Sequence, residues 1–377
     1  MDVREKMAFL GAASQYDVCG ESAPAASSQT RRDLTNYVAQ AVMPGGQCIR
    51  LLKVLLSSVC ENDCAYCAFR AARDVRRAAF APEELARCFD QMWRAGLVEG
   101  LFLSSGIGTS PVREMDRMIA TVEILRQEYA FGGYVHLKVL PGAGPDQIER
   151  AVALANRVST NLEAPNPHRL ASLSQRKVFE SQLLGSLRVA SRLARGPRPG
   201  PSLVSVTTQF VVGAADEGDR EILSTSAQLY RELGLARIYY SRFGPVPGTP
   251  LEGHAATSPL REHRLYQADF LLRHYGFPFE DLVFDSQGNL PIEQDPKRAW
   301  AQAHPEQFPV EVNRAGRHLL MRVPGIGPTV ADRILRERRR GALTDLAHLR
   351  KLGAQVDRAA PFVLLNGRRP PLQLRLW

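Results

Sequence analysis

The sequence lacks the long apolar runs of membrane proteins and the dense cysteines of secreted, disulfide-stabilised domains. No apolar run reaches the roughly 18 residues that span a bilayer, and the first residues show no basic-then-apolar signal pattern. Six cysteines occur in 377 residues, and Cys19, Cys48 and Cys88 are widely separated. Their spacing indicates neither a disulfide framework nor a second metal cluster. We therefore expect a cytoplasmic protein with no membrane partner and, from its length, two domains.

Acidic residues are scarce at the C-terminal end of the chain. From Arg314 to Trp377 the sequence has 14 Lys and Arg residues against four Asp and Glu, a net charge of +10. Because the whole chain carries +9, residues 1–313 carry −1. Such a concentration of positive charge in one segment is typical of a nucleic-acid-binding appendage on a neutral catalytic body.

The remaining three cysteines, Cys60, Cys64 and Cys67, lie together in the string CENDCAYC. Their C-x3-C-x2-C spacing supplies three thiolates in one loop, one fewer than a closed tetrahedral metal site requires. A zinc site completed by histidine is an alternative, but the nearest histidine in the sequence is His136. Buried core cysteines are another alternative, although the polar residues 61–63 indicate a loop. The spacing favours a metal cluster with one open coordination position.

The surroundings of these cysteines resemble the radical S-adenosylmethionine (radical SAM) superfamily. The apolar segment LLKVLLSSV, which predicts a buried strand, precedes Cys60, and the aromatic Tyr66 precedes Cys67. The superfamily carries C-x3-C-x-aromatic-C in the loop after its first barrel strand. The resemblance implies a [4Fe–4S] cluster that binds S-adenosylmethionine at its open iron. One-electron reduction of S-adenosylmethionine would cleave it to methionine and a 5′-deoxyadenosyl radical, which abstracts hydrogen from a substrate.

Strand and helix patterns alternate through the middle of the chain. Six strands are predicted, at residues 51–57, 100–105, 134–140, 157–163, 203–212 and 236–243. Six consecutive strand–helix units predict an α/β fold, a partial parallel (βα)6 TIM-like barrel. We expect an N-terminal extension at 1–45, the barrel at 46–290, a linker at 291–313 and a small all-α domain at 314–377.

Residues that follow these strands are candidates for cofactor binding, because parallel barrels place chemistry at the carboxyl ends of their strands. The resemblance implies that S-adenosylmethionine contacts a Gly-rich turn, a ribose-binding acidic element, a carboxylate-binding cation and an adenine-contacting segment. The corresponding candidates are Ser104, Ser105, Gly106, Asn161, Glu163, Arg176 and Gln209. An ordinary Ser/Gly turn remains the alternative for Ser104 to Gly106, and a solvated strand end remains the alternative for Asn161 and Glu163. Arg176 and Lys177 are predicted to open the next helix, where a solvated first helical turn is the alternative.

The C-terminal segment resembles a helix-hairpin-helix motif that binds DNA. An apolar helix, the turn Val323-Pro324-Gly325-Ile326-Gly327 and a helix opening at Pro328 follow one another. Glycines let the backbone approach a phosphate, and the free N–H groups of the second helix can donate to it. We expect nucleic-acid contacts at Val323, Gly325, Ile326, Gly327 and Thr329. A degenerate second hairpin is predicted around Leu352-Gly353, with a packing module as the alternative.

Together these segments resemble a bacterial family of DNA modification or repair radical SAM proteins, often associated with uracil-DNA-glycosylase-like partners. In that family's N-terminal pattern, Tyr16, Asp17 and Cys19 could reach the active site, with surface or core roles as alternatives. The resemblance implies an enzyme that acts on nucleic acid, DNA rather than RNA, and an electron donor such as flavodoxin or ferredoxin. The alternatives are an RNA-modifying enzyme acting on tRNA and a nucleic-acid-binding protein whose cluster is structural or redox-sensing.

Overall fold

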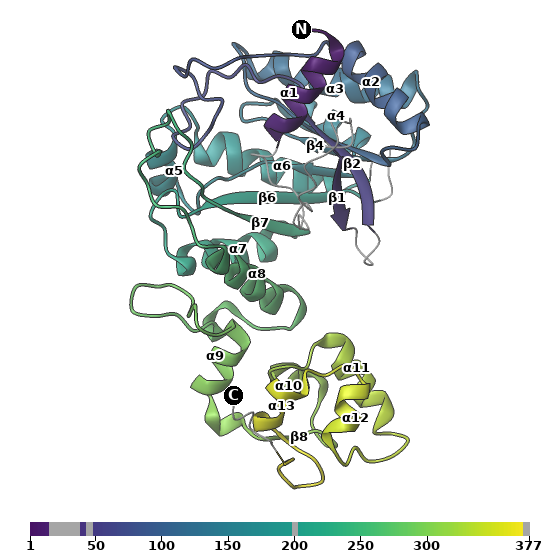
Figure 1. Ribbon diagram of the computed structural model, residues 1–377, viewed down its shortest axis with the longest axis vertical. Coiled ribbons are helices and arrows are strands. Elements are labelled where there is room, and N and C mark those ends of the chain that lie inside the picture. Colours follow the sequence, from purple (N-terminus) through teal and green to yellow (C-terminus); the bar gives the residue numbers. More distant parts are fainter. Residues whose placement is uncertain (15–37, 43–47, 198–202, 372–377) are drawn as a thin grey trace. The chain divides into compact units, whose positions relative to one another are not determined.

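The computed structural model describes residues 1–14, 38–42, 48–197 and 203–371 (Figure 1). Tyr16, Asp17 and Cys19 lie outside the described residues. The chain divides into two compact units, residues 1–217 with 228–257 and residues 218–227 with 258–377. None of the helices in the described part of the chain is both long and apolar enough to cross a membrane.

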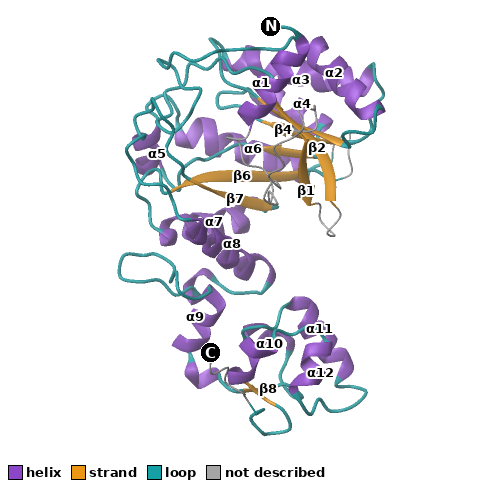
Figure 2. Ribbon diagram, in the orientation of Figure 1, coloured by secondary structure: helices purple, strands orange, loops and turns teal. Residues whose placement is uncertain are grey.

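The first unit is built on one seven-stranded sheet whose strands lie in sequence order (Figure 2). The strands are β1 (Val38–Val42), β2 (Cys48–Leu55), β3 (Gly100–Ser104), β4 (Tyr134–Lys138), β5 (Arg157–Ser159), β6 (Ser205–Val212) and β7 (Arg237–Arg242). β1 pairs antiparallel with β2, and the six strands from β2 to β7 are parallel. The α/β fold with a curled, largely parallel half-barrel is confirmed. The edge strand β1 was not predicted.

The parallel strands are connected by segments whose apolar residues recur on one face of a helix, and these segments form helices. They are α2 (Pro82–Arg94), α3 (Pro111–Gln127), α4 (Pro145–Leu154), α5 (Pro167–Leu173), α6 (Gly185–Arg195) and α7 (Asp219–Leu233). α2, for example, buries Leu85, Phe89 and Met92. Proline opens α2, α3 and α4, where its fixed φ suits the first helical turn and no N–H is needed. A preceding helix, α1 (Val3–Ala13), begins with a capping box formed by Asp2 and Glu5.

Arg176 and Lys177 do not open a helix, contrary to the sequence-based expectation. They lie in a turn between α5 and the π-helix η3 (Phe179–Leu184). The turn is held by Asp63, whose carboxylate accepts hydrogen bonds from the Ser174 hydroxyl at 2.5 Å and the Gln175 N–H at 3.0 Å. Asp63 of the cysteine loop thus holds the start of this turn through one side chain and one backbone N–H.

The second unit contains α8 (Pro259–His274), α9 (Pro296–Ala303), α10 (Arg317–Arg322), α11 (Pro328–Glu337), α12 (Leu346–Lys351) and α13 (Val356–Ala359). Two short strands, β8 (Val310–Glu311) and β9 (Val363–Leu364), pair in parallel. The expectation of an all-α module is therefore wrong in this detail. Val310 and Val312 join the apolar core of the hairpin helices, so part of the segment 291–313 folds with this core. The functional boundary at residue 314 stays a prediction.

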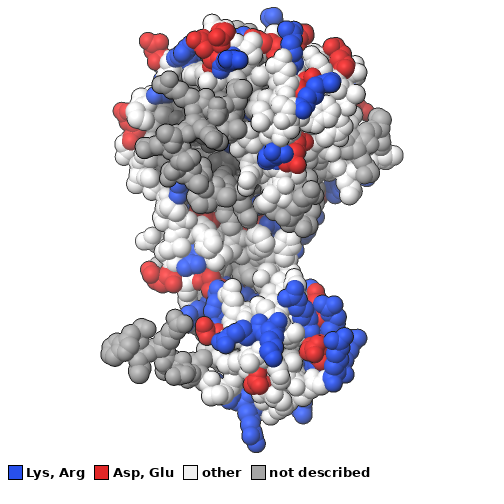
Figure 3. Space-filling model, turned by 45° about the vertical axis from the view of Figure 1, so that its right-hand side comes forward, with Lys and Arg blue, Asp and Glu red and all other residues white. Residues whose placement is uncertain are grey.

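Positive side chains gather over the surface of the hairpin helices (Figure 3). The exposed ones are Arg314, Arg317, Arg333, Arg336, Arg339, Arg340, Arg350, Lys351, Arg368 and Arg369. Not every positive side chain counted in the sequence is free to bind a ligand. Arg322 is buried in an ion pair with Asp281, and the Arg338 guanidinium donates to the carbonyl groups of Val312 and Ala315. Some of the positive charge therefore stabilises the module itself.

Candidate functional site

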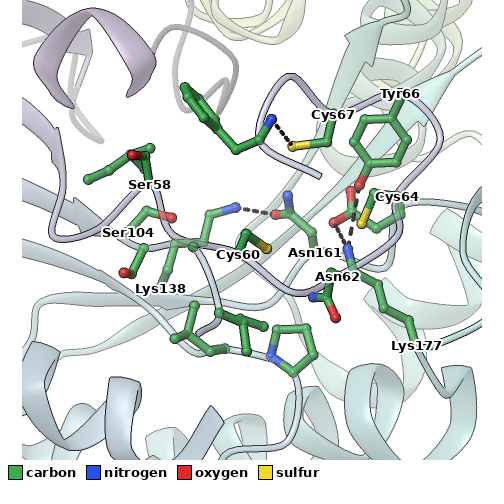
Figure 4. Close-up of a pocket in the computed structure, with 18 of the residues that line it drawn as sticks. Ser58, Cys60, Asn62, Cys64, Tyr66, Cys67, Ser104, Lys138, Asn161 and Lys177 are labelled. Carbon is green, nitrogen blue, oxygen red and sulfur yellow. Dashed lines mark hydrogen bonds and ion pairs between the residues drawn. The ribbon is translucent and has the colours of Figure 1, made fainter. Parts of the chain in front are cut away.

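A pocket opens at the carboxyl ends of the parallel strands of the first unit (Figure 4). Its empty volume is about 910 Å³, including space open to solvent, which is within the usual range for cofactor sites. The loop after β2 contributes Cys60, Cys64 and Cys67, and the end of β3 with the turn after it contributes Ser104, Ser105, Gly106 and Ile107. Lys138, Asn161, Glu163, Lys177 and Gln209 add further polar groups to the lining. Three thiols and groups from several strand ends therefore face one space.

The cysteine loop is held in place by a network that uses its own backbone. The Arg77 guanidinium donates to the carbonyl oxygens of Ser58, Phe69, Arg70 and Arg73 at 2.7–3.2 Å. One side chain thus satisfies four buried or half-buried acceptors along the loop, which fixes its path before any ligand binds.

Asp63 fixes the opposite side of the loop. Although partial burial raises the pKa of this carboxyl, the hydrogen bonds from Ser174 and Gln175 lower it below its ordinary value. The charged carboxylate therefore links the cysteine loop to the turn that carries Lys177. The N–H of Ala65 adds a bond of 2.8 Å to the carbonyl of Leu173.

Gly106 packs directly against the cysteine loop. Its N–H donates to the Ser57 carbonyl at 2.7 Å, and the neighbouring Ile107 carbonyl accepts from the N–H of Glu61 at 2.7 Å. A Cβ at position 106 would lie 2.5 Å from the Val59 carbonyl oxygen and 3.2 Å from the Cβ of Cys60. Glycine is therefore required here by close backbone approach, a reason that the sequence alone does not reveal.

Three polar contacts line the pocket wall. The Lys138 ammonium donates to the Asn161 amide oxygen at 2.5 Å, and Lys177 lies 2.8 Å from the Glu163 carboxylate and 3.5 Å from the Tyr66 hydroxyl. Burial opposes the charge on Lys177, but attraction to the Glu163 carboxylate, and to Cys64 when its thiol is ionised, outweighs burial and raises the pKa of the lysine. Figure 4 shows Lys138, Asn161 and Lys177 pointing into the space beside the cysteine loop.

The three cysteines are spread along the loop, with Cys64 buried and Cys60 and Cys67 half-buried. Burial raises the pKa of Cys64, and it raises that of Cys67 to about 12, so both are protonated at neutral pH in the absence of a metal. Among the residues that the structure describes, no three or more His, Cys, Asp or Glu side chains converge closely enough to hold one metal ion. This does not favour a zinc site. The cysteines that hold a [4Fe–4S] cluster bind different irons, so they need not converge on a single point.

Six of the seven predicted cofactor residues line the pocket, namely Ser104, Ser105, Gly106, Asn161, Glu163 and Gln209. Arg176 does not line it, because its guanidinium bonds to the Glu61 carbonyl outside. Lys138 was missed. The alternation of YVHLKVL, with Val135, Leu137 and Val139 buried on one face, could have placed His136 and Lys138 together on the other.

The predicted hairpin in the second unit lies between α10 and α11 as expected. Val323 and Ile326 bury their side chains in the apolar core, so only their backbone can face a ligand. Gly325 has φ +83°, and Thr329 is exposed in the first turn of α11. The N–H groups of such a first turn lack partners within the helix and can donate to phosphate.

The second predicted hairpin is also formed, between α12 and α13, with Gly353 at φ +96°. The two hairpins interlock, because the N–H of Gln355 donates to the Gly325 carbonyl at 3.0 Å. A Cβ on Gly325 would lie 2.5 Å from the Gln355 carbonyl oxygen. The buried Lys297 of α9 holds the same turn, donating to the Ile326 carbonyl at 2.5 Å.

Comparison with known proteins identifies both parts of the chain. Residues 54–225 match the family model of the radical SAM superfamily, and residues 306–363 match that of the helix-hairpin-helix motif. The chain therefore contains a radical SAM domain and a helix-hairpin-helix motif. Together with its relatives, the domain supports an enzyme of the radical SAM class, and members of that superfamily use a [4Fe–4S] cluster and S-adenosylmethionine.

Two curated proteins are similar to part of the chain. It is 27% identical over 209 residues to the threonylcarbamoyladenosine tRNA methylthiotransferase MtaB of Thermotoga maritima, covering 54% of this chain and 46% of that protein. It is 25% identical over 219 residues to the 7,8-didemethyl-8-hydroxy-5-deazariboflavin synthase of Methanosarcina barkeri, covering 54% and 64%. The similarity thus spans from about half to just under two thirds of the length of these relatives.

Among solved structures, part of the chain is matched by methylornithine synthase, PylB, with a TM-score of 0.47 at 18% identity, covering 58% of this chain and 60% of that one. The [FeFe]-hydrogenase maturase HydG has a TM-score of 0.48 at 13% identity, covering 72% and 62%.

Proposed function

We propose that this chain is a radical SAM enzyme that modifies or repairs nucleic acid, with DNA as its substrate. The observation that carries the proposal is the opening of three loop cysteines onto a pocket lined by polar strand ends, in a chain that also has a basic helix-hairpin-helix motif. When bound, a [4Fe–4S] cluster and S-adenosylmethionine supply a 5′-deoxyadenosyl radical for hydrogen abstraction. The protein's own residues bind, orient and shield these groups.

Each group of pocket residues has a proposed role. Cys60, Cys64 and Cys67 would hold the cluster, with their loop fixed beforehand by Arg77 and Asp63. A ligand in the pocket would meet hydroxyl, amide and carboxylate groups from Ser104, Ser105, Asn161, Glu163 and Gln209, which suit the polar groups of S-adenosylmethionine. Cys64, Lys138 and Glu163 are buried in the pocket wall, so groups bound against them would be shielded from water on that side.

The helix-hairpin-helix motif would hold the nucleic acid. Backbone donors at Gly325, Gly327 and Thr329 suit phosphate, and the exposed arginines add sequence-independent attraction. A target base would have to leave the stack or be single-stranded to reach a pocket at the strand ends. A flavodoxin or ferredoxin would donate the electron, and a uracil-DNA-glycosylase-like protein is the proposed partner in repair.

Anaerobic reconstitution with iron and sulfide tests the radical chemistry. With a strong reductant and S-adenosylmethionine, we expect 5′-deoxyadenosine and methionine from the wild-type protein and neither from Cys60→Ala, Cys64→Ala or Cys67→Ala. Cys88→Ala is the matched control, because Cys88 is half-buried on α2 and does not line the cysteine pocket. A reconstituted wild-type protein that yields no 5′-deoxyadenosine contradicts the proposal and favours a structural or redox-sensing cluster.

RNA is the second candidate substrate, favoured by the similarity to a tRNA methylthiotransferase. Competition of duplex and single-stranded DNA against tRNA, measured from about 50 to 200 mM salt, separates the two. We expect DNA to be bound more tightly across this range. A preference for tRNA at every salt concentration would overturn the assignment to DNA and leave the radical chemistry intact.

A further inference from the structure

The peptide group between Ala68 and Phe69 links the cysteine loop to an arginine that does not line the pocket. Its N–H, on Phe69, donates to the Cys67 sulfur with 3.4 Å between nitrogen and Sγ, a contact that Figure 4 marks with a dashed line. Its carbonyl, on Ala68, accepts a hydrogen bond of 2.6 Å from Nη1 of Arg73. One planar group therefore lies between a guanidinium and a cysteine sulfur.

This peptide group can transmit the charge of Arg73. Because the peptide bond is conjugated, a cation at the carbonyl oxygen draws electron density away from the nitrogen. The N–H then becomes a stronger donor, as in other chains of cooperative hydrogen bonds. We therefore expect the hydrogen bond to Cys67 to be stronger with Arg73 in place than without it.

Arg73 is held in position from a second side. Its Nη2 donates to the Pro247 carbonyl at 2.6 Å, in the loop that follows β7. The next residue, Gly248, has φ +71°, and a Cβ there would lie 3.1 Å from Nε of Arg73. Glycine suits this position both for its backbone conformation and for the room that it leaves to the guanidinium. The loop after β7 thus fixes the arginine against the cysteine loop.

The charge of Arg73 acts on the cysteine loop. Its two acceptors are carbonyl oxygens, and its guanidinium forms no ion pair with a residue that the structure describes. Arg77, which donates to four carbonyl groups of the same loop, likewise has no carboxylate partner in the described part of the chain. Two positive side chains therefore contact the backbone around the third cysteine, where they favour negative charge on a bound group.

Charge and hydrogen bonds at the sulfurs set the reduction potential of an iron–sulfur cluster. Three thiolates carry more negative charge than the oxidised [4Fe–4S] core carries positive charge, so a cluster held by three cysteines is an anion. Reduction adds one further electron. A cation or a hydrogen-bond donor beside a sulfur therefore stabilises the reduced state more than the oxidised state and raises the potential.

We propose that Arg73 is a positioning residue that fixes and strengthens the Phe69 N–H bond to Cys67, and so raises the reduction potential of the bound cluster. The inference rests on the proposed function for the role of Cys67 as a cluster ligand. Arg73 makes no hydrogen bond to a cysteine and does not line the pocket, so it acts through the peptide group. A higher potential allows a weaker one-electron donor to reduce the cluster.

A redox titration followed by electron paramagnetic resonance tests this role on the reconstituted full chain, with dithionite as reductant and without S-adenosylmethionine. For Arg73→Gln we expect the ratio of reduced to oxidised cluster at a fixed potential to fall about tenfold, which is ~59 mV for a one-electron couple. Arg73→Lys should lose less, because an ammonium group keeps the charge and can donate to the Ala68 carbonyl. Variants are compared at equal iron and sulfide content.

Arg76→Gln is the matched control. Arg76 belongs to the same loop, but its side chain is 62% exposed and its guanidinium lies 4.0 Å from the Glu5 carboxylate. The variant removes the same charge and leaves the Ala68–Phe69 peptide group untouched. We expect it to titrate as the wild type does.

An unchanged potential in Arg73→Gln would overturn the proposal, as would an equal shift in Arg76→Gln. If Arg73→Gln does not assemble a cluster, Gly248→Ala takes its place, because the added Cβ displaces the guanidinium without removing it. Its potential should also fall, and a wild-type value there would equally overturn the proposal.

Failure of the proposed function gives a different result. A wild-type protein that binds no cluster, or a Cys67→Ala variant that binds a complete one, contradicts the assignment of the cysteines. A wild-type protein that cleaves S-adenosylmethionine, together with an Arg73→Gln variant of unchanged potential, removes only the role of Arg73.

Discussion

Lys177 and Glu163 form a buried ion pair at the wall of the cysteine pocket, with 2.8 Å between Nζ and Oε1 and side-chain exposures of 7% and 8%. Glu163 adopts φ +66°, a left-handed conformation that costs a non-glycine residue about 1–3 kcal/mol. Its N–H donates to the Gln209 carbonyl, and its carbonyl accepts from Val211, so β6 holds it in this conformation. This backbone conformation directs the Glu163 carboxylate towards Lys177, the only lysine among residues 174–178.

Removing one member of this pair should cost more stability than removing both. Lys177→Met leaves a buried carboxylate without its partner, and we expect the free energy of unfolding to fall by about 3–5 kcal/mol. The double variant Lys177→Met/Glu163→Leu should recover part of that loss. Urea denaturation of preparations with equal iron content measures both values.

The exposed pair Arg188–Glu180, at 3.4 Å, is the matched control for this experiment. Arg188→Ala should change the free energy of unfolding by less than about 1 kcal/mol, because solvent screens the pair. If Lys177→Met lowered the free energy of unfolding no more than Arg188→Ala does, the ion pair at the pocket wall would not behave as a buried pair.

Gly106→Ala should displace the cysteine loop. The new Cβ would lie 2.5 Å from the Val59 carbonyl oxygen, so the loop or the turn after β3 must move. We expect the variant to retain less than about half of the wild-type iron and sulfide after anaerobic reconstitution, because the cysteines depend on this packing. Gly108→Ala is the control, since no atom lies within 4 Å of its added Cβ. Equal iron content in the two variants would show that the close approach of Gly106 is not needed for cluster assembly.

Much of the barrel could be predicted from the sequence because buried parallel strands leave strong local patterns. GLFLS is a continuous buried run, and six of the eight residues of SVTTQFVV are buried. The helices α3, α4 and α5 begin at prolines. β1, with the short sequence VAQAV at the sheet edge, carries no such pattern and forms only through its pairing with β2. Edge strands depend on a partner that lies elsewhere in the chain.

The cysteines of the candidate site could be predicted from residue type and position in a loop. Residues whose role depends on the direction of the side chain were harder to predict. Arg176 and its neighbour Lys177 are both cations in one turn, and only tertiary contacts decide that Lys177 enters the pocket. The positive charge that the C-terminal segment offers to a ligand was overestimated for a similar reason. Arg322 and Arg358 are held by Asp281 and Asp295 within the second unit, contacts that a sum over the sequence does not reveal.

Gly325→Ala should weaken nucleic-acid binding while leaving the iron content unchanged. The substitution places a Cβ 2.5 Å from the Gln355 carbonyl oxygen, at a residue with φ +83°. We expect the turn before α11 to shift and duplex affinity to fall about tenfold at constant salt, since its backbone donors need fixed positions. Gly316→Ala, which meets no atom within 4 Å, should bind as the wild type does. Unchanged duplex affinity in Gly325→Ala would place the nucleic-acid contacts on the arginines alone.

Lys297 should make the stability of the second unit depend on pH above neutrality. Its ammonium is buried beneath the hairpin, 4.7 Å from the centre of the Tyr275 ring. Burial, with Arg358 and Arg322 nearby, lowers its pKa to about 7 despite the attraction of Asp295. In the unfolded chain the lysine would titrate near its ordinary pKa of about 10.4. Between these two values the unfolded state binds the extra proton, so stability must rise as the pH rises from 7 towards 10.

The comparison of wild type with Lys297→Met isolates this contribution. We expect the free energy of unfolding of the wild type to gain on that of the variant by up to about 1.4 kcal/mol per pH unit between pH 7 and 10, with little change below pH 7. Lys351→Met, at an exposed lysine of α12, should show no such slope. Because both lysines lie in the second unit, urea denaturation followed at several pH values reports on the same transition in each variant. Parallel pH profiles for the wild type and Lys297→Met would mean that Lys297 keeps its proton in the folded protein, bound to the Ile326 carbonyl as an ammonium ion.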